Sequence, residues 1–132
     1  MFATADGGLS TPAVYAECDR IRAAGGGAVP PPRESAALMA ALAAGDAKAL
    51  GAALTNDLEP AALALRPSLR AALDAGRDLG AIGALVSGSG PTCAFLAEDA
   101  AGAAALADAL GRAGVAAQTL TAHGPVPGAT II

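Results

Sequence analysis

The chain has 132 residues, a length that suits one domain with a single hydrophobic core and requires neither disulfides nor a structural metal. Its formal net charge is −4 at pH 7, and its basic residues are scattered among acidic ones. This argues against nucleic acid as a partner, because phosphate backbones are bound by clustered lysines and arginines. Hydrophobic residues make up 54% of the sequence but aromatic residues only 2%, so we expect a shallow core of small side chains.

The sequence indicates neither a membrane span nor a secretory signal. Two uncharged stretches, 79–97 and 113–132, are long enough to cross a membrane, but glycines, prolines and hydroxyl residues interrupt both. No basic segment leads into an apolar run with a small-residue cleavage site. Cys18 and Cys93 fall on predicted apolar faces, which is typical of buried thiols in a reducing compartment, with a disulfide between them as the alternative. We therefore expect a cytoplasmic protein without a membrane partner.

The first quarter of the chain predicts a strand, a helix and a long connection. Residues 1–5 are typical of the end of a strand, and an Asp-Gly-Gly turn follows. Ser10 or Thr11 can cap a helix whose apolar residues recur at i, i+4 and i+7 until it closes near Gly25. The segment 25–33, with three glycines and then three prolines, is predicted to be a connector rather than a binding loop.

Helical patterns dominate the middle of the chain. The expected helices cover 34–44, 46–54, a piece ending near Leu65, and a stretch from Pro67 to Gly76. Between the second and the third, the segment Asn56-Asp57-Leu58-Glu59-Pro60 interrupts the pattern. Asn, Asp and Pro in this order predict an Asx-type turn.

The last part of the chain predicts a hairpin, a helix and a strand. Two short apolar runs, 82–86 and 92–96, flank a turn, and an alanine-rich helix begins at Glu98-Asp99. Residues 115–122 favour a strand, and 129–132 could add a short edge strand. This order predicts an α+β fold, with an antiparallel sheet of about four strands and helices on one face.

The hairpin tip, Ser87-Gly88-Ser89-Gly90-Pro91, allows two interpretations. Its glycines can adopt positive φ and bring bare backbone N–H groups against a phosphate, or the segment can simply turn a corner. It is not a P-loop, a dinucleotide fingerprint or a nucleophile elbow, because the required lysine, third glycine and outer glycine spacing are missing. The residues alone therefore indicate an anion-facing loop or a plain turn.

No catalytic set can be assembled from the chain by itself. His123 is the only histidine, so neither a histidine triad nor a histidine metal cluster is available, and we expect it at the surface. Glu98 and Asp99 sit at a helix start, where the helix dipole favours acids without any catalytic role. We predict no catalytic residue and no metal ligand here.

The segment Val86 to Thr92 resembles the third, C-terminal motif of the GHMP small-molecule kinases. Three further segments are similar to the 4-diphosphocytidyl-2-C-methyl-D-erythritol kinases within that superfamily, and all four keep the family order from one end of the chain to the other. These segments are Gly8 to Tyr15, Asn56 to Pro60 and Gly124 to Ala129.

The resemblance implies that residues 1–132 form the ferredoxin-like C-terminal domain of such a kinase. In the family, the ATP loop and the groups that handle the substrate hydroxyl lie in an N-terminal domain, which this sequence does not contain. The expected partners are that domain and the substrate 4-diphosphocytidyl-2-C-methyl-D-erythritol. ATP and Mg would serve the longer enzyme and not this part alone, which we expect to be inactive. An apolar face exposed in the absence of the N-terminal domain could drive self-association.

The resemblance also implies roles for individual residues. Thr11 is expected to make a polar substrate contact, and Tyr15 to stack on the cytosine, unless it is an ordinary core tyrosine. Asn56 and Asp57 match a family motif with a structural role first and a role in the cleft second. The residues expected to face the ATP loop and substrate phosphates are Ser87, Gly88, Ser89, Gly90, Pro91 and Thr92.

Two other functions remain open on the sequence. The chain could belong to another GHMP kinase, of homoserine or mevalonate type, although the Leu-Ser-Thr-Pro segment and the Gly-Pro-Val-Pro-Gly tail argue against it. It could also be a free-standing ferredoxin-like module that binds a ligand without catalysis.

Overall fold

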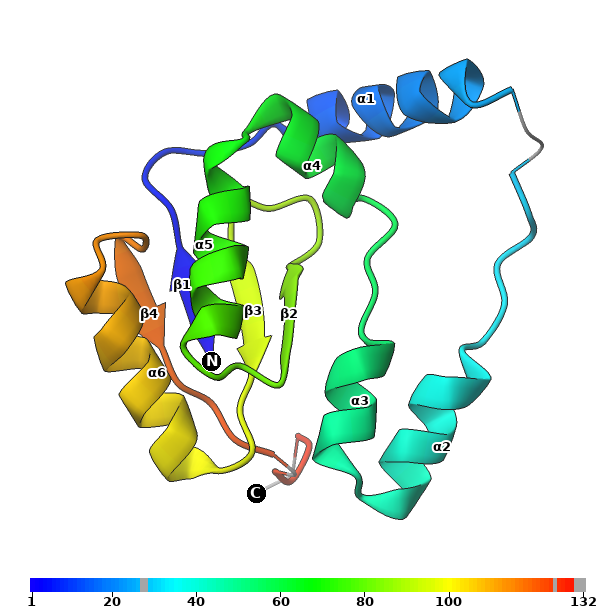
Figure 1. Cartoon of the computed structure of the whole chain (residues 1–132). Coiled ribbons are helices and arrows are strands. Elements are labelled where there is room, and N and C mark those ends of the chain that lie inside the picture. The colour runs from blue at the N-terminus through cyan, green and yellow to red at the C-terminus, as the bar shows by residue number, and fades with distance from the viewer. Residues whose placement is uncertain (27–28, 125, 130–132) are drawn as a thin grey trace.

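A computed structural model describes residues 1–26, 29–124 and 126–129 (Figure 1). Its four strands form one antiparallel sheet in the order β2-β3-β1-β4, which confirms the predicted α+β fold. The elements in chain order are β1 (Phe2–Thr4), α1 (Thr11–Ala24), α2 (Ala36–Ala44), α3 (Ala47–Ala53), α4 (Glu59–Leu65), α5 (Ser68–Asp78), β2 (Gly83–Val86), β3 (Cys93–Leu96), α6 (Ala100–Arg112) and β4 (Gln118–Leu120).

The helices begin where short polar side chains can accept orphan backbone N–H groups. Ser10 caps α1, Ser35 caps α2, Asp46 caps α3 and Asp99 caps α6, each by accepting the N–H three residues later. Asp99 makes the shortest of these bonds, 2.7 Å to the N–H of Gly102. Local sequence therefore decides where these helices start.

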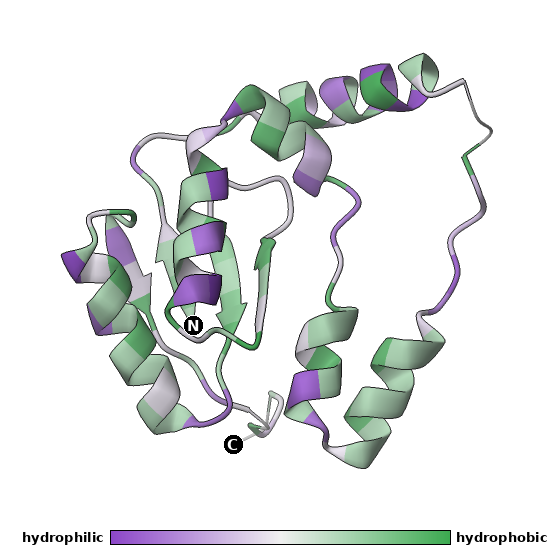
Figure 2. Ribbon diagram, viewed as in Figure 1, coloured by the Kyte–Doolittle hydropathy of each residue, from purple (hydrophilic) through white to green (hydrophobic). Residues whose placement is uncertain are grey.

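Helices α5 and α6 lie side by side over one face of the sheet (Figure 1). The residues that α5 buries are apolar or glycine, and its hydrophilic positions, seen as purple bands in Figure 2, are exposed. The buried cluster below them joins both helices to residues of β1, β2 and β3, with the alternation of a half-buried strand clearest in β3, where Cys93 and Phe95 are buried. Its largest fully buried side chains are Leu69, Leu73, Leu110, Val14, Val86 and Cys93.

The prediction that α5 ends at Gly76 is wrong, because the helix continues to Asp78. Gly76 is buried inside the helix, and a Cβ there would lie 2.0 Å from Cε1 of Phe95. The glycine is present because an aromatic ring from β3 packs against the helix backbone, not because the helix stops. Phe95 is 3% exposed, so this contact lies in the core.

Five helices, α1 to α5, lie between β1 and β2 in the chain. Helix α1 packs on α4 near the hairpin loop, whereas α2 and α3 form a separate pair beside the edge strand β2 (Figure 1). The α3 backbone approaches β2 closely at Gly51 and Gly83: a Cβ on Gly51 would lie 2.0 Å from the carbonyl oxygen of Ile82. Small residues on both sides therefore set the distance between α3 and the sheet.

The last strand is shorter than expected. Residues 115–122 were expected to be extended, but only Gln118–Leu120 pair with β1. The expected edge strand over 129–132 lies almost wholly outside the described residues, and Ala129 has no regular structure. Among the helices of the described ranges, none has the length and apolarity needed to cross a membrane.

Candidate functional site

The loop between β2 and β3 runs from Ser87 to Thr92 and is closed by its own backbone. The Ser87 N–H donates to the Thr92 carbonyl (2.7 Å) and the Gly90 N–H to the Ser87 carbonyl (3.0 Å). Gly88 and Gly90 have φ of 57° and 76°, the left-handed region that side chains rarely adopt, and the Gly90–Pro91 peptide is cis. Glycine is therefore favoured at both positions by the backbone conformation, as predicted from the sequence.

Gly90 also has a packing reason. A Cβ there would lie 3.0 Å from Cγ1 of Val86 and 3.3 Å from Cδ1 of Leu9. The C-terminal half of the loop therefore rests on the core, whereas a Cβ at Gly88 would meet nothing within 4 Å. Gly88 is the exposed residue of the loop, and its other five residues are half-buried.

Two successive backbone donors at the tip of the loop have no internal acceptor. Among the hydrogen bonds of the described residues, none uses the N–H groups of Gly88 and Ser89. A pair of successive free N–H groups can bind an anion without any charged side chain. Gly88 and Ser89 are also the two central residues of the turn closed by the Gly90 N–H, and central N–H groups of such a turn are ordinarily free, so both interpretations of the loop stay open on this observation.

The start of α1 lies against this loop. The Thr11 and Ser89 hydroxyl oxygens are 2.9 Å apart and share a hydrogen bond, although 78 residues separate them in sequence. Ser10 caps the helix and Pro12 occupies its first turn, so backbone chemistry fixes where Thr11 sits. The structure therefore brings together two segments that the sequence singled out separately.

Tyr15 lies one helical turn after Thr11 and is 55% exposed. The inward face of α1 is formed by Val14 and Cys18 instead. The interpretation of Tyr15 as an ordinary core residue is therefore wrong. An exposed aromatic ring next to a polar helix start is the kind of surface on which a planar group can stack.

Asn56 reaches the same loop from the other side. Its Nδ2 donates to the carbonyls of Val86 (2.6 Å) and Gly88 (2.8 Å), and its Oδ1 accepts the Leu58 N–H (3.1 Å). The last bond is the predicted Asx turn. Asp57, by contrast, points to solvent with its side chain 86% exposed, and its carboxylate lies 3.6 Å from the guanidinium of Arg22.

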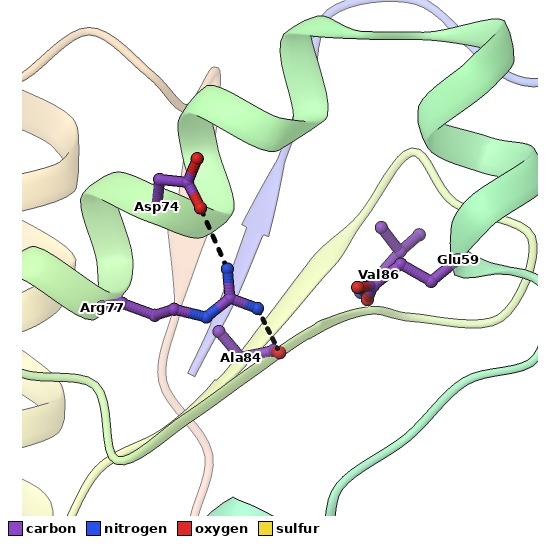
Figure 3. Close-up of polar contacts among 5 residues, drawn as sticks. All are labelled: Glu59, Asp74, Arg77, Ala84 and Val86. Atoms are coloured by element: carbon purple, nitrogen blue, oxygen red, sulfur yellow. Dashed lines mark hydrogen bonds and ion pairs between the residues drawn. The ribbon is translucent and has the colours of Figure 1, made fainter.

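Sequence reasoning missed Glu59. Its carboxylate accepts the N–H of Val86 at 2.8 Å (Figure 3). The available signal was its spacing three residues after Asn56, because a turn brings positions i and i+3 to the same side. Only the structure shows that both side chains converge on one strand residue, 27 and 30 residues away.

The cysteines are not nucleophiles in this arrangement. Both are free and buried, so the disulfide alternative is wrong. Burial, followed by the charge of Glu59, raises the pKa of Cys93 to about 11, so its thiol stays protonated near neutral pH. No group of three or more His, Cys, Asp or Glu side chains within 1–26, 29–124 and 126–129 could hold a metal ion.

A groove of about 550 Å³ lies behind Asn56, and no sequence signal indicated it. One wall is the C-terminal half of α1, with Ile21 and Arg22, and the other is the segment 55–57 followed by Pro60. Its lining is mainly apolar and open to solvent.

Comparisons with known proteins agree with this geometry. Residues 38–116 match the family described as GHMP kinases C terminal. The chain is 64% identical over its full length to a 4-diphosphocytidyl-2-C-methyl-D-erythritol kinase of Thermobifida fusca and 58% identical to one of Streptomyces avermitilis. It spans only 42% and 44% of the lengths of these relatives.

Solved structures show the same fold. A crystal structure of 4-(cytidine 5'-diphospho)-2C-methyl-D-erythritol kinase superposes with a TM-score of 0.66 at 30% identity, covering 84% of this chain and 38% of that one. A homoserine kinase from Cytophaga hutchinsonii gives a TM-score of 0.62 at 20% identity, covering 84% and 35%, which shows the shared fold alone. By its family match, its sheet topology and its glycine loop, the chain belongs to the GHMP kinases, whose C-terminal part it matches.

Proposed function

We propose that this chain is the C-terminal part of an enzyme that transfers the γ-phosphoryl group of ATP to the 2-hydroxyl of 4-diphosphocytidyl-2-C-methyl-D-erythritol. The observation that carries the proposal is the similarity over the whole chain to kinases named for this substrate, at 64% and 58% identity. The convergence of Thr11, Asn56 and the Ser87–Thr92 loop on one surface supports it.

This part would supply one wall of the substrate cleft. Phosphoryl transfer depends on positioning and on stabilising the charge of the transferred group. The free N–H groups of Gly88 and Ser89 suit contact with a phosphate oxygen, and bound ATP would supply the phosphoryl group. The described residues offer no donor set for Mg, so we assign none of them to the metal. Catalytic groups would come from the N-terminal part, so we expect no activity from this chain alone.

Thr11 and Tyr15 would contact the substrate. They lie four residues apart on one face of α1, and both are exposed. The Thr11 hydroxyl would make a polar contact beside the loop, while the Tyr15 ring would stack on the cytosine. Replacing Tyr15 by Ala should then raise the KM for the cytidine-containing substrate, whereas Phe, which keeps the ring, should leave KM within about twofold.

The test is an ATP-dependent phosphorylation assay on 4-diphosphocytidyl-2-C-methyl-D-erythritol, with homoserine as the competing substrate. The chain is assayed alone and after mixing with the N-terminal part of the Thermobifida fusca kinase. We expect no phosphorylation by the chain alone and phosphorylation after the two parts are mixed. Size-exclusion chromatography shows whether the two parts associate, and an associated but silent pair contradicts the proposal. Activity on homoserine instead would favour the homoserine-type alternative.

The N-terminal part of the longer kinase is also the proposed protein partner. Phe2 on β1 and Leu120 on β4 pair directly across the sheet and are 38% and 59% exposed. Apolar neighbours of this kind are typical of a surface that another protein covers. Self-association of the chain in the absence of that part, and a cytoplasmic location, stay predictions.

A further inference from the structure

We propose that Asn56 and Glu59 are positioning residues that fix the conformation of the Ser87–Thr92 loop. In this conformation the N–H groups of Gly88 and Ser89 stay available to a ligand. The positioning stands on the contacts of this chain. Its consequence for a phosphate-bearing ligand rests on the proposed function.

The two side chains act from one turn. The Glu59 N–H donates to the Asn56 carbonyl at 3.0 Å, and the Leu58 N–H donates to the Asn56 side chain. This doubly bonded turn immediately precedes α4, so both side chains leave the backbone from a fixed point. The side chain of Asn56 is held within the turn by the bond to its Oδ1, and the carboxylate of Glu59 is held by the Val86 N–H.

Their target is the residue at which the strand becomes the loop. β2 is an edge strand, and the N–H and carbonyl of Val86 both face away from β3. Glu59 accepts that N–H and Asn56 donates to that carbonyl, so together they satisfy both outward groups of one residue. Unpaired backbone groups at this partly buried edge would otherwise cost free energy.

The same edge is covered two residues earlier by a different side chain. The Arg77 guanidinium donates to the Ala84 carbonyl at 3.2 Å and pairs with Asp74 at 3.0 Å (Figure 3). Arg77 therefore protects the strand but does not touch the loop. This separates two roles, sealing an edge strand and positioning a loop.

Only Asn56 goes beyond the strand. Its second Nδ2 bond, 2.8 Å to the Gly88 carbonyl, reaches into the loop itself. The peptide whose carbonyl accepts this bond carries the N–H of Ser89, one of the two N–H groups without an internal acceptor, so Asn56 fixes the orientation of that peptide directly. On the opposite side, the hydroxyl pair of Thr11 and Ser89 holds the tip. The loop is thus fixed from two sides, and its free donors lie between them.

The test measures backbone order at Gly88 and Ser89 by ¹⁵N relaxation, in this chain, beside its free energy of unfolding in urea. Asn56→Asp removes both donated bonds and sets a carboxylate against two carbonyl oxygens. Asn56→Ala removes them without adding charge. We expect order parameters at both residues to fall from about 0.85 to below about 0.6 in either variant.

Glu59→Ala removes the acceptor of the Val86 N–H and should lower order at Gly88 and Ser89, and wild-type order in this variant overturns the role of Glu59. Two controls bracket these results. Glu59→Gln keeps an oxygen that can accept the Val86 N–H and should leave the loop ordered. Arg77→Ala opens the edge at Ala84 alone and should also leave the loop ordered. Wild-type order in Asn56→Ala overturns the proposal. An equal loss of order in Arg77→Ala also overturns it, because the loop would then depend on the edge as a whole.

A kinetic measurement separates this inference from the proposed function. In the mixture with the N-terminal part, Asn56→Ala should lower kcat/KM at least tenfold, whereas Arg77→Ala should stay within about twofold. If the wild-type mixture associates but is inactive, the proposed function fails. The relaxation data still decide whether Asn56 and Glu59 position the loop.

Discussion

The contact between Gly76 and Phe95 allows a prediction of defined sign and size. In Gly76→Ala, the new methyl group would lie 2.0 Å from Cε1, 2.4 Å from Cδ1 and 3.0 Å from Cζ of the ring. Carbon atoms prefer separations of about 3.5–4.0 Å, so three ring atoms would have to move. Phe95 is 3% exposed and has no route to solvent, so the ring and helix α5 must separate.

Two opposing terms set the magnitude. Overpacking a core typically costs about 1–3 kcal/mol, and this overlap belongs at the upper end because one partner is helix backbone. Alanine is better than glycine in a helix interior by about 0.5–1 kcal/mol. We therefore expect Gly76→Ala to lower the free energy of unfolding by about 2–2.5 kcal/mol.

The assay is urea denaturation followed by circular dichroism, with Gly111→Ala as the matched control. Gly111 lies in α6, and a Cβ there meets no heavy atom within 4 Å. The same substitution should therefore raise stability by about 0.5–1 kcal/mol at this position. If both variants are stabilised alike, the packing argument is refuted. Replacing the ring by a smaller side chain in Phe95→Leu should reduce the loss of stability caused by Gly76→Ala when the two substitutions are combined.

Three further outcomes are expected from the same denaturation assay. Asp99→Ala removes the cap of α6 and should lower the free energy of unfolding by about 1 kcal/mol. Its control is Asp108→Ala, at an exposed position of the same helix, which should change stability by less than about 0.5 kcal/mol. Equal effects of the two substitutions would contradict the capping role. The pKa of Cys93 is raised from 9.0 to about 11, so the unfolded chain loses this proton first. Stability should therefore fall as pH rises from 9 to 11, and Cys93→Ala should flatten that slope. In Gly51→Ala the new methyl group would lie 2.0 Å from the Ile82 carbonyl oxygen. This substitution should destabilise the protein at least as much as Gly76→Ala, because both contact partners are backbone. A neutral result would show that α3 can move away from β2 without cost.

The predicted helix starts agree with the structure because their causes are local. Ser10 accepts the N–H of a residue three positions later, and so does Asp99. Such bonds depend only on the chain within one helical turn, so residue type and spacing suffice to predict them. The hairpin is equally local, since its two strands and its glycine turn are contiguous.

The errors and omissions have long-range causes. Gly76 looked like a helix end because glycine often follows a helix, and only the position of the Phe95 ring explains it inside one. Tyr15 could have faced the core or solvent until α4 covered the neighbouring face of α1. The strand at 118–120 is limited by the three residues of β1 with which it pairs.

The candidate site divides in the same way. The sequence by itself determined which segments form the candidate site, because glycines at positive φ, a helix cap and an Asx turn each depend on residues that are neighbours in the chain. Tertiary structure decided how these segments meet: Thr11 with Ser89, and Asn56 and Glu59 with Val86 and the loop. The physical reason is that a side-chain hydrogen bond is satisfied within about 3 Å, and the folded backbone alone brings residues 27 to 78 positions apart to that distance.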